Sequence, residues 1–198
     1  MSNENREVVN ESWLEGGIGC CLEARRDVVQ LRDQWPQIEY IDQDGVTRTH
    51  TFDWHITLVN KQRFAVAVKP FDKVVSTGLA QVIELIRKQR SHRDHANGIV
   101  ILTERDFTRD DAANAKAVLR ARRLRDDREV QAALTELKTV NGTVLFGDLV
   151  RHAPVEAYRR NALWTLIDLG ILLPLVREKI TDRTKMWVNQ DALKDGFS

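Results

Sequence analysis

The stretch HTFDWHITLVNKQRFAVAVKP, residues 50–70, decides the fold. Apolar and polar residues alternate through THTFDWHITLV and again through FAVAVKP, and the turn-forming NKQR lies between them. This pattern predicts two neighbouring antiparallel strands, with Asp53 on the first and Lys69 at the end of the second. Ala67 lies two residues before Lys69, at a position where a metal site would require a carboxylate or an amide. Whether these strands carry an active site is therefore the first question.

The flanking segments extend this pair of strands into a sheet with helices. Apolar positions from about Ile18 to Trp35 predict a helix that Pro36 ends, and QIEYI predicts a further strand. STGLAQVIELIRKQR predicts a second helix with Ser76 or Thr77 as its N-cap. Ile99–Leu102 predicts a central strand, and residues 108–127 a third helix. The order α-β-β-β-α-β-α predicts an α/β fold: a mixed sheet flanked by helices.

The composition changes near Asp127, which indicates a second domain. Residues 128–138, 142–153 and 154–172 predict three helices with one short strand, and PLVREKITDRTKMWV predicts a β-ribbon. Three helices and a ribbon are the plan of a winged helix. We therefore expect a boundary between residues 126 and 140, with domains at 14–127 and 128–198.

Bulk composition limits the class of protein. The 198 residues are 42% hydrophobic and 30% charged, with a net charge of +1, which is ordinary for a globular chain. No apolar run approaches the roughly 20 residues of a membrane span. The N-terminus lacks a signal-peptide pattern, so we expect a cytoplasmic protein that does not enter a membrane. Cys20 and Cys21 are adjacent and predict neither a disulfide framework nor a metal site.

Asp53 and Lys69 are the first candidates for chemistry. A buried carboxylate must be paired or bind a cation, because an isolated buried charge is costly. Asp53 can hold Mg²⁺, and Lys69 can orient or deprotonate a water molecule that attacks a phosphate. Glu23, on the first predicted helix, can supply a further ligand. The alternatives are an Asp53–Lys69 ion pair at a sheet end and, for Glu23, a solvated helix acid.

The runs CLEARRDVVQL, WPQIEYIDQDGVTRTHTFDWHITL and FAVAVKP resemble the N-terminal domain of TnsA, a transposon endonuclease of the PD-(D/E)XK, restriction-endonuclease-like superfamily. GTVLFGDLV and YRRNALWTLIDLGIL resemble its winged C-terminal domain, so the resemblance covers most of residues 14–175. It implies a Mg²⁺ or Mn²⁺ site for DNA cleavage, in which Glu23, Asp53 and Lys69 match the motif residues. It also implies contacts with a transposase or another recombination protein through the C-terminal domain.

Two residues depart from the family pattern. Phe52 replaces the proline before Asp53, which the superfamily tolerates. Ala67 replaces the carboxylate or amide of the (E/Q)-x-K motif, and a methyl group cannot bind a metal. On the following helix, Gln81 or Glu84 can in principle supply the missing ligand; the alternative for Glu84 is an exposed helix acid.

Basic clusters predict a surface for double-stranded DNA, because lysine and arginine neutralise phosphates. The alternative is a solvated helix face balanced by nearby acids. His50, His55, His92 and His95 have no metal-ligand spacing. The candidate DNA contacts are Arg87, Lys88, Arg90, Arg93, Lys116, Arg120, Arg123, Arg159 and Arg160, with Lys179, Arg183 and Lys185 on the predicted wing.

Three functions remain open at the level of sequence. The first is a Mg²⁺-dependent DNA endonuclease acting in transposition or phage recombination. The second is a binding module that keeps the nuclease fold but has lost catalysis at Ala67. The third is a transcriptional regulator that relies on its winged helix.

Overall fold

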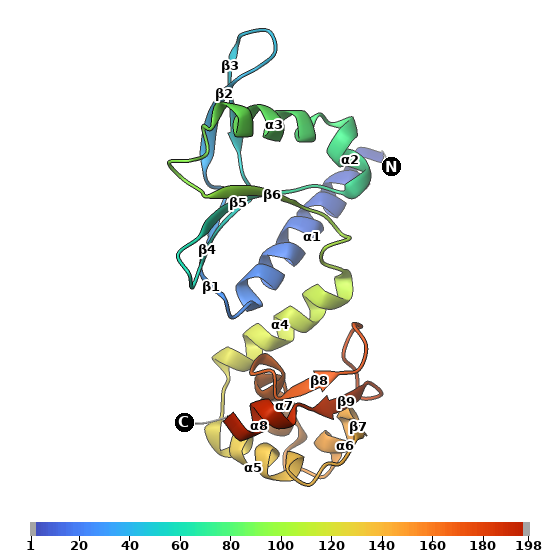
Figure 1. Cartoon of the computed structure of the whole chain (residues 1–198). Coiled ribbons are helices and arrows are strands. Elements are labelled where there is room, and N and C mark those ends of the chain that lie inside the picture. The colour runs from blue at the N-terminus through green and yellow to red at the C-terminus, as the bar shows by residue number, and fades with distance from the viewer. Residues whose placement is uncertain (1–2, 196–198) are drawn as a thin grey trace. The chain divides into compact units, whose positions relative to one another are not determined.

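The computed structural model describes residues 3–195, and the surroundings of side chains from Trp13 to Lys194 (Figure 1). The chain divides into two compact units, one up to Ala112 and one from Ala113 onward. The division falls within helix α4 (Arg109–Arg123), before the interval predicted for the boundary. No helix of residues 3–195 is long and apolar enough to cross a membrane.

The first unit contains a mixed four-stranded sheet in the order β1-β4-β5-β6. Its strands are β1 (Val28–Asp33), β4 (Trp54–Leu58), β5 (Arg63–Val68) and β6 (Gly98–Leu102). Neighbours pair antiparallel except β5 and β6, which are parallel and joined by a crossover through α2 (Phe71–Ser76) and α3 (Leu79–Gln89). The mixed sheet was predicted, but β6 lies at its edge and not at its centre.

Helices pack on both faces of this sheet (Figure 1). Alternation along β5 sends Ala65 and Ala67 to the face covered by α3, and Val66 to the face covered by α1 (Asn3–Ala24). Ile83 and Ile86 of α3 are fully buried in the first cluster. Leu14, Ile18 and Leu22 of α1 are buried in the second.

Two predicted elements are wrong. The helix predicted from about Ile18 to Trp35 ends at Ala24, and Val28–Asp33 is strand β1, paired with β4. The stretch THTFDWHITLV is not one strand. Its first part is β3 (Thr47–Thr51), which pairs only with β2 (Gln37–Ile41) in a separate two-stranded sheet, and its second part is β4.

The break between β3 and β4 positions the candidate site. Phe52 at the break is fully buried and packs in the α3-side cluster. Burial of this ring fixes the chain where it passes from one sheet to the other. Asp53, the next residue, is therefore held at the start of β4, beside the carboxyl end of β5.

The second unit combines helices with a small sheet. It contains most of α4, then α5 (Asp127–Leu137), α6 (Phe146–Arg151), α7 (Glu156–Asp168) and α8 (Gln190–Asp195). Its strands β7 (Thr143–Leu145), β9 (Lys185–Val188) and β8 (Leu172–Pro174) form an antiparallel sheet in that order. Helices near 128–138 and 154–172 were predicted; α8 was not. Residues Ala162–Leu166 of α7 are all buried, which makes α7 the central helix of this unit.

Candidate functional site

Asp53 accepts hydrogen bonds from the backbone of two other segments of the first unit. Its Oδ2 accepts a hydrogen bond of 2.7 Å from the Val68 N–H, and its carbonyl accepts one of 2.8 Å from the Gln34 N–H. Val68 is the last residue of β5 and directly precedes Lys69. Asp53 and the backbone of Lys69 therefore lie close together at one end of the two inner strands, β4 and β5.

Helix α1 brings Glu15 to the same edge. Gln34 Nε2 donates a 2.9 Å hydrogen bond to Glu15 Oε1. Burial raises the pKa of the Glu15 carboxyl group, the nearby Asp53 carboxylate raises it further, and the Gln34 hydrogen bond acts in the opposite direction. A smaller increase comes from Asp33, the last residue of β1. Glu15 and Asp53 thus form a pair of carboxylates close enough to repel each other.

A glycine allows α1 to approach this closely. A Cβ atom on Gly19 would lie 2.3 Å from Cζ2 of Trp54, so only glycine fits here against the indole ring. The Trp54 Nε1–H also donates a 3.3 Å hydrogen bond to the Glu15 carbonyl. Trp54 follows Asp53 in the chain, so these contacts hold Glu15 and Asp53 on facing elements.

Lys69 directly follows the last residue of β5. Its N–H donates a 3.1 Å hydrogen bond to the Leu102 carbonyl, extending the parallel pairing of β5 and β6. Ala67 is 1% exposed and packs in the cluster with Phe52 and Ile83. The position that carries a ligand in the family motif is here filled by a core methyl group.

The other predicted ligands lie elsewhere. Glu23 is exposed and sits eight residues after Glu15, about 12 Å further along α1 at 1.5 Å per residue. Glu84 is exposed, with Oε1 3.5 Å from Lys88 Nζ, one turn along α3. Gln81 is also exposed, while the side of α3 that packs beside Ala67 is made by Val82, Ile83 and Ile86. Among the side chains of residues 13–194, no group of three or more His, Cys, Asp or Glu converges as a metal site.

Sequence reasoning missed Glu15. The signal that could have found it is the cluster Gly16, Gly17 and Gly19, because glycine inside a helix commonly marks a close approach of another element. An acid one turn before such a contact is brought to the facing element. Glu23 was preferred because it lies on the acidic face of the predicted helix and matches the helix glutamate of the family that the sequence resembles.

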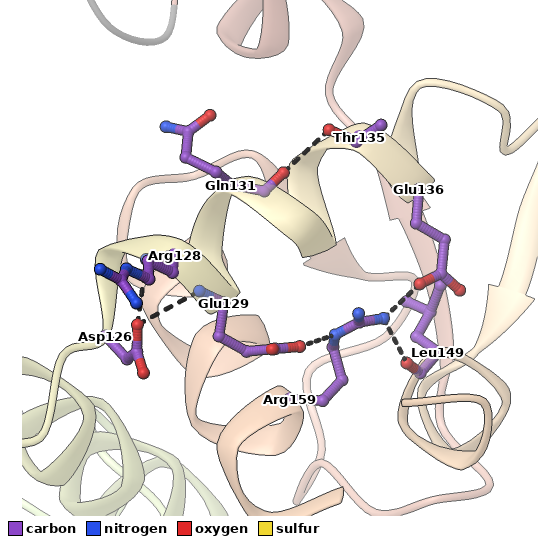
Figure 2. A network of polar contacts seen from close by, with 8 residues as sticks. All are labelled: Asp126, Arg128, Glu129, Gln131, Thr135, Glu136, Leu149 and Arg159. Carbon is purple, nitrogen blue, oxygen red and sulfur yellow. Dashed lines mark hydrogen bonds and ion pairs between the residues drawn. The ribbon is translucent and has the colours of Figure 1, made fainter. Parts of the chain in front are cut away.

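Arg159, predicted to contact DNA, is instead buried in an ion-pair network of the second unit (Figure 2). Its side chain is 8% exposed, and its Nε donates a 2.6 Å hydrogen bond to Glu129 Oε1. Its Nη1 donates to Glu136 Oε2 and, at 3.3 Å, to the Leu149 carbonyl. The guanidinium joins α5, α6 and α7 and cannot reach a phosphate, so this part of the prediction is wrong.

Some of the other predicted DNA contacts are bonded within the protein, and others are exposed. Arg87 Nη2 donates a 2.8 Å hydrogen bond to the Ile99 carbonyl, and Arg160 forms an ion pair with Asp182. Helix α4 exposes three basic side chains at helical spacing, away from the buried Ala115 and Val118. Helix α4 therefore carries an exposed basic face, formed by Lys116, Arg120 and Arg123.

The histidines serve the core of the first unit. His55 on β4 is 3% exposed, its Nε2 lies 3.1 Å from the His95 carbonyl, and Trp35 meets its ring edge-on at 4.5 Å. Since a carbonyl only accepts, Nε2 carries the proton and Nδ1 is a buried acceptor. Burial lowers the pKa of His55, and burial also lowers the pKa of His50.

Comparisons with known proteins give no relative from which to transfer a function. No protein-family model matches the chain, and no curated protein matches it.

Proposed function

We propose that the chain is a TnsA-like, Mg²⁺-dependent DNA endonuclease, with a restriction-endonuclease-like first unit and a winged-helix-like second unit. The observation that carries the proposal is that Glu15 and Asp53 share Gln34 as a hydrogen-bond partner, while Asp53 also accepts from Val68, the residue before Lys69. A cation bound by both carboxylates would offset the repulsion between their charges. Mg²⁺ is commonly held by one or two carboxylates, with waters and substrate phosphates completing its shell.

Each residue has a distinct part in this proposal. Glu15 and Asp53 would hold the metal ion, which supplies charge stabilisation to the phosphate when bound. Lys69, at the end of β5, would orient the attacking water or accept its proton. Hydrogen bonds from the Val68 and Gln34 N–H groups fix Asp53, so its position does not depend on the metal. This edge of the sheet would receive one strand of the duplex.

The exposed basic side chains of α4 support DNA as the substrate class. Lys116, Arg120 and Arg123 follow one another without an acid on that side of the helix. They would supply sequence-independent affinity through phosphate contacts. Binding should therefore weaken steeply as salt concentration rises.

Nicking of supercoiled plasmid by the purified full-length chain, with Mg²⁺ or Mn²⁺, tests this function. Asp53→Asn and Lys69→Met should each lower the nicking rate by about a hundredfold or more. Glu84→Gln is the matched control, because it removes an exposed carboxylate of α3 and should leave the rate unchanged. Absence of metal-dependent nicking by the parent, or equal nicking by Asp53→Asn, would contradict the proposal.

A second candidate is a binding module that has kept the fold and lost catalysis. The burial of Ala67 among apolar side chains favours it, as does the lack of a three-ligand cluster among the side chains of residues 13–194. On this account the parent retards a DNA duplex in a gel but never nicks it. Ala67→Glu would then restore no cleavage and would destabilise the fold, because it places a charge in an apolar cluster.

A docking role for the second unit, with a transposase or other recombination protein, would fit either candidate. This unit has a pocket of about 1040 Å³, partly lined by Leu124 and Tyr158, whose relative exposures are 64% and 60%. Exposed large apolar side chains of this kind commonly mark protein contacts. Substituting both with serine should leave plasmid nicking intact and weaken only assembly with such a partner.

A further inference from the structure

Gln34 has a backbone conformation that its side chain does not favour. It follows the last residue of β1 and has a φ of +46°, in the left-handed region. Residues other than glycine, asparagine and aspartate rarely occupy this region, because Cβ meets the backbone. Such conformations persist where surrounding contacts enforce them, and they cluster at functional sites.

The contacts of Gln34 explain what this conformation achieves. The Gln34 N–H donates a 2.8 Å hydrogen bond to the Asp53 carbonyl. Its side-chain Nε2 donates a 2.9 Å hydrogen bond to Glu15 Oε1. One residue therefore bonds to both members of the carboxylate pair, using its backbone for one and its side chain for the other.

The chemistry of an amide suits this place. The Gln34 amide bonds the Glu15 carboxylate while the Gln34 backbone bonds Asp53, so one residue ties the two acids together. A neutral amide supplies the donor without adding a cation that would compete with a metal ion. The hydrogen bond engages Oε1, and Glu15 retains a second carboxylate oxygen, Oε2.

We propose that Gln34 is a positioning residue of the site, whose amide holds Glu15 in place to bind a divalent cation together with Asp53. This inference rests on the proposed function and deepens it. Gln34 itself contacts neither the metal nor the substrate.

Calorimetric titration of the full-length chain with Mn²⁺ tests the assignment, with melting temperature measured on the same samples. Gln34→Met keeps the length of the side chain and the strained left-handed backbone, but it removes the hydrogen-bond donor. Gln34→Gly removes the donor and relieves the strain, because glycine adopts positive φ freely. Both variants should lose about tenfold or more in Mn²⁺ affinity. Gln34→Gly should melt at or above Gln34→Met, since its backbone is unstrained.

The outcomes separate this inference from the proposed function. If the parent takes up no Mn²⁺, the proposed function fails and Gln34 has no site to position. If the parent binds Mn²⁺ and Gln34→Met binds it equally well, only the inference is overturned. Unfolding of both variants at the titration temperature would also overturn it, because Gln34 would then be structural.

Discussion

The two units each bring charged side chains together, but in opposite ways. In the second unit, Arg159 is buried between Glu129 and Glu136, so one guanidinium group offsets part of the charge of two carboxylates. In the first unit, burial and then the nearby Asp53 carboxylate raise the pKa of Glu15. The arginine joins three helices of the second unit, whereas we propose that the two carboxylates of the first unit bind an added cation.

The largest expected effect comes from breaking the buried ion pairs of Arg159. Arg159→Met leaves Glu129 and Glu136 without their shared cation and should lower the free energy of unfolding by about 3 kcal/mol. Chemical denaturation measures it. Arg160→Met is the matched control: it lies next in the chain, and its partner Asp182 has a side chain 60% exposed, so its loss should be below about 1 kcal/mol. Equal losses would show that Arg159 is no more structural than its neighbour.

Part of this contrast could be predicted from sequence. Lys69 was placed at the end of its strand because Pro70 follows it, and α5 and α7 were predicted from helical periodicity. The break at Phe52 was not predicted, because the alternation continues across it. Only the burial of that ring in the α3-side cluster, and the pairing of β3 with β2, reveal it. Arg159 was misplaced because its partners lie 30 and 23 residues away on another helix.

A methyl group at Gly19 tests the packing that brings Glu15 close to Asp53 in the first unit. Gly19→Ala should push α1 away from Trp54 and lower the free energy of unfolding by about 1–3 kcal/mol, as overpacking usually does. The shift should also separate Glu15 from Asp53 and weaken Mn²⁺ binding. Gly16→Ala is the control, because a Cβ there has no neighbour within 4 Å. Unchanged metal affinity in Gly19→Ala would remove the link between this packing and the site.

The smallest effect concerns pH. His55 has a lowered pKa because of burial, with Arg63, Arg32 and His95 adding to the repulsion of a proton. The unfolded state therefore takes up a proton first as pH falls, and stability present above the ordinary histidine pKa of about 6.5 declines below it. His55→Gln should have a flatter dependence of unfolding free energy between pH 7.5 and 5 than the parent, as measured by urea denaturation. The exposed His152, replaced by Gln, should leave the slope unchanged.

The central claim is that Glu15, and not Glu23, is the acid that α1 supplies to the site. The direct measurement is Mn²⁺ affinity by calorimetry for the parent, Glu15→Gln and Glu23→Gln. The structure predicts that Glu15→Gln loses about tenfold or more in affinity, while Glu23→Gln binds as the parent does. Loss of binding in Glu23→Gln with retention in Glu15→Gln would contradict the account.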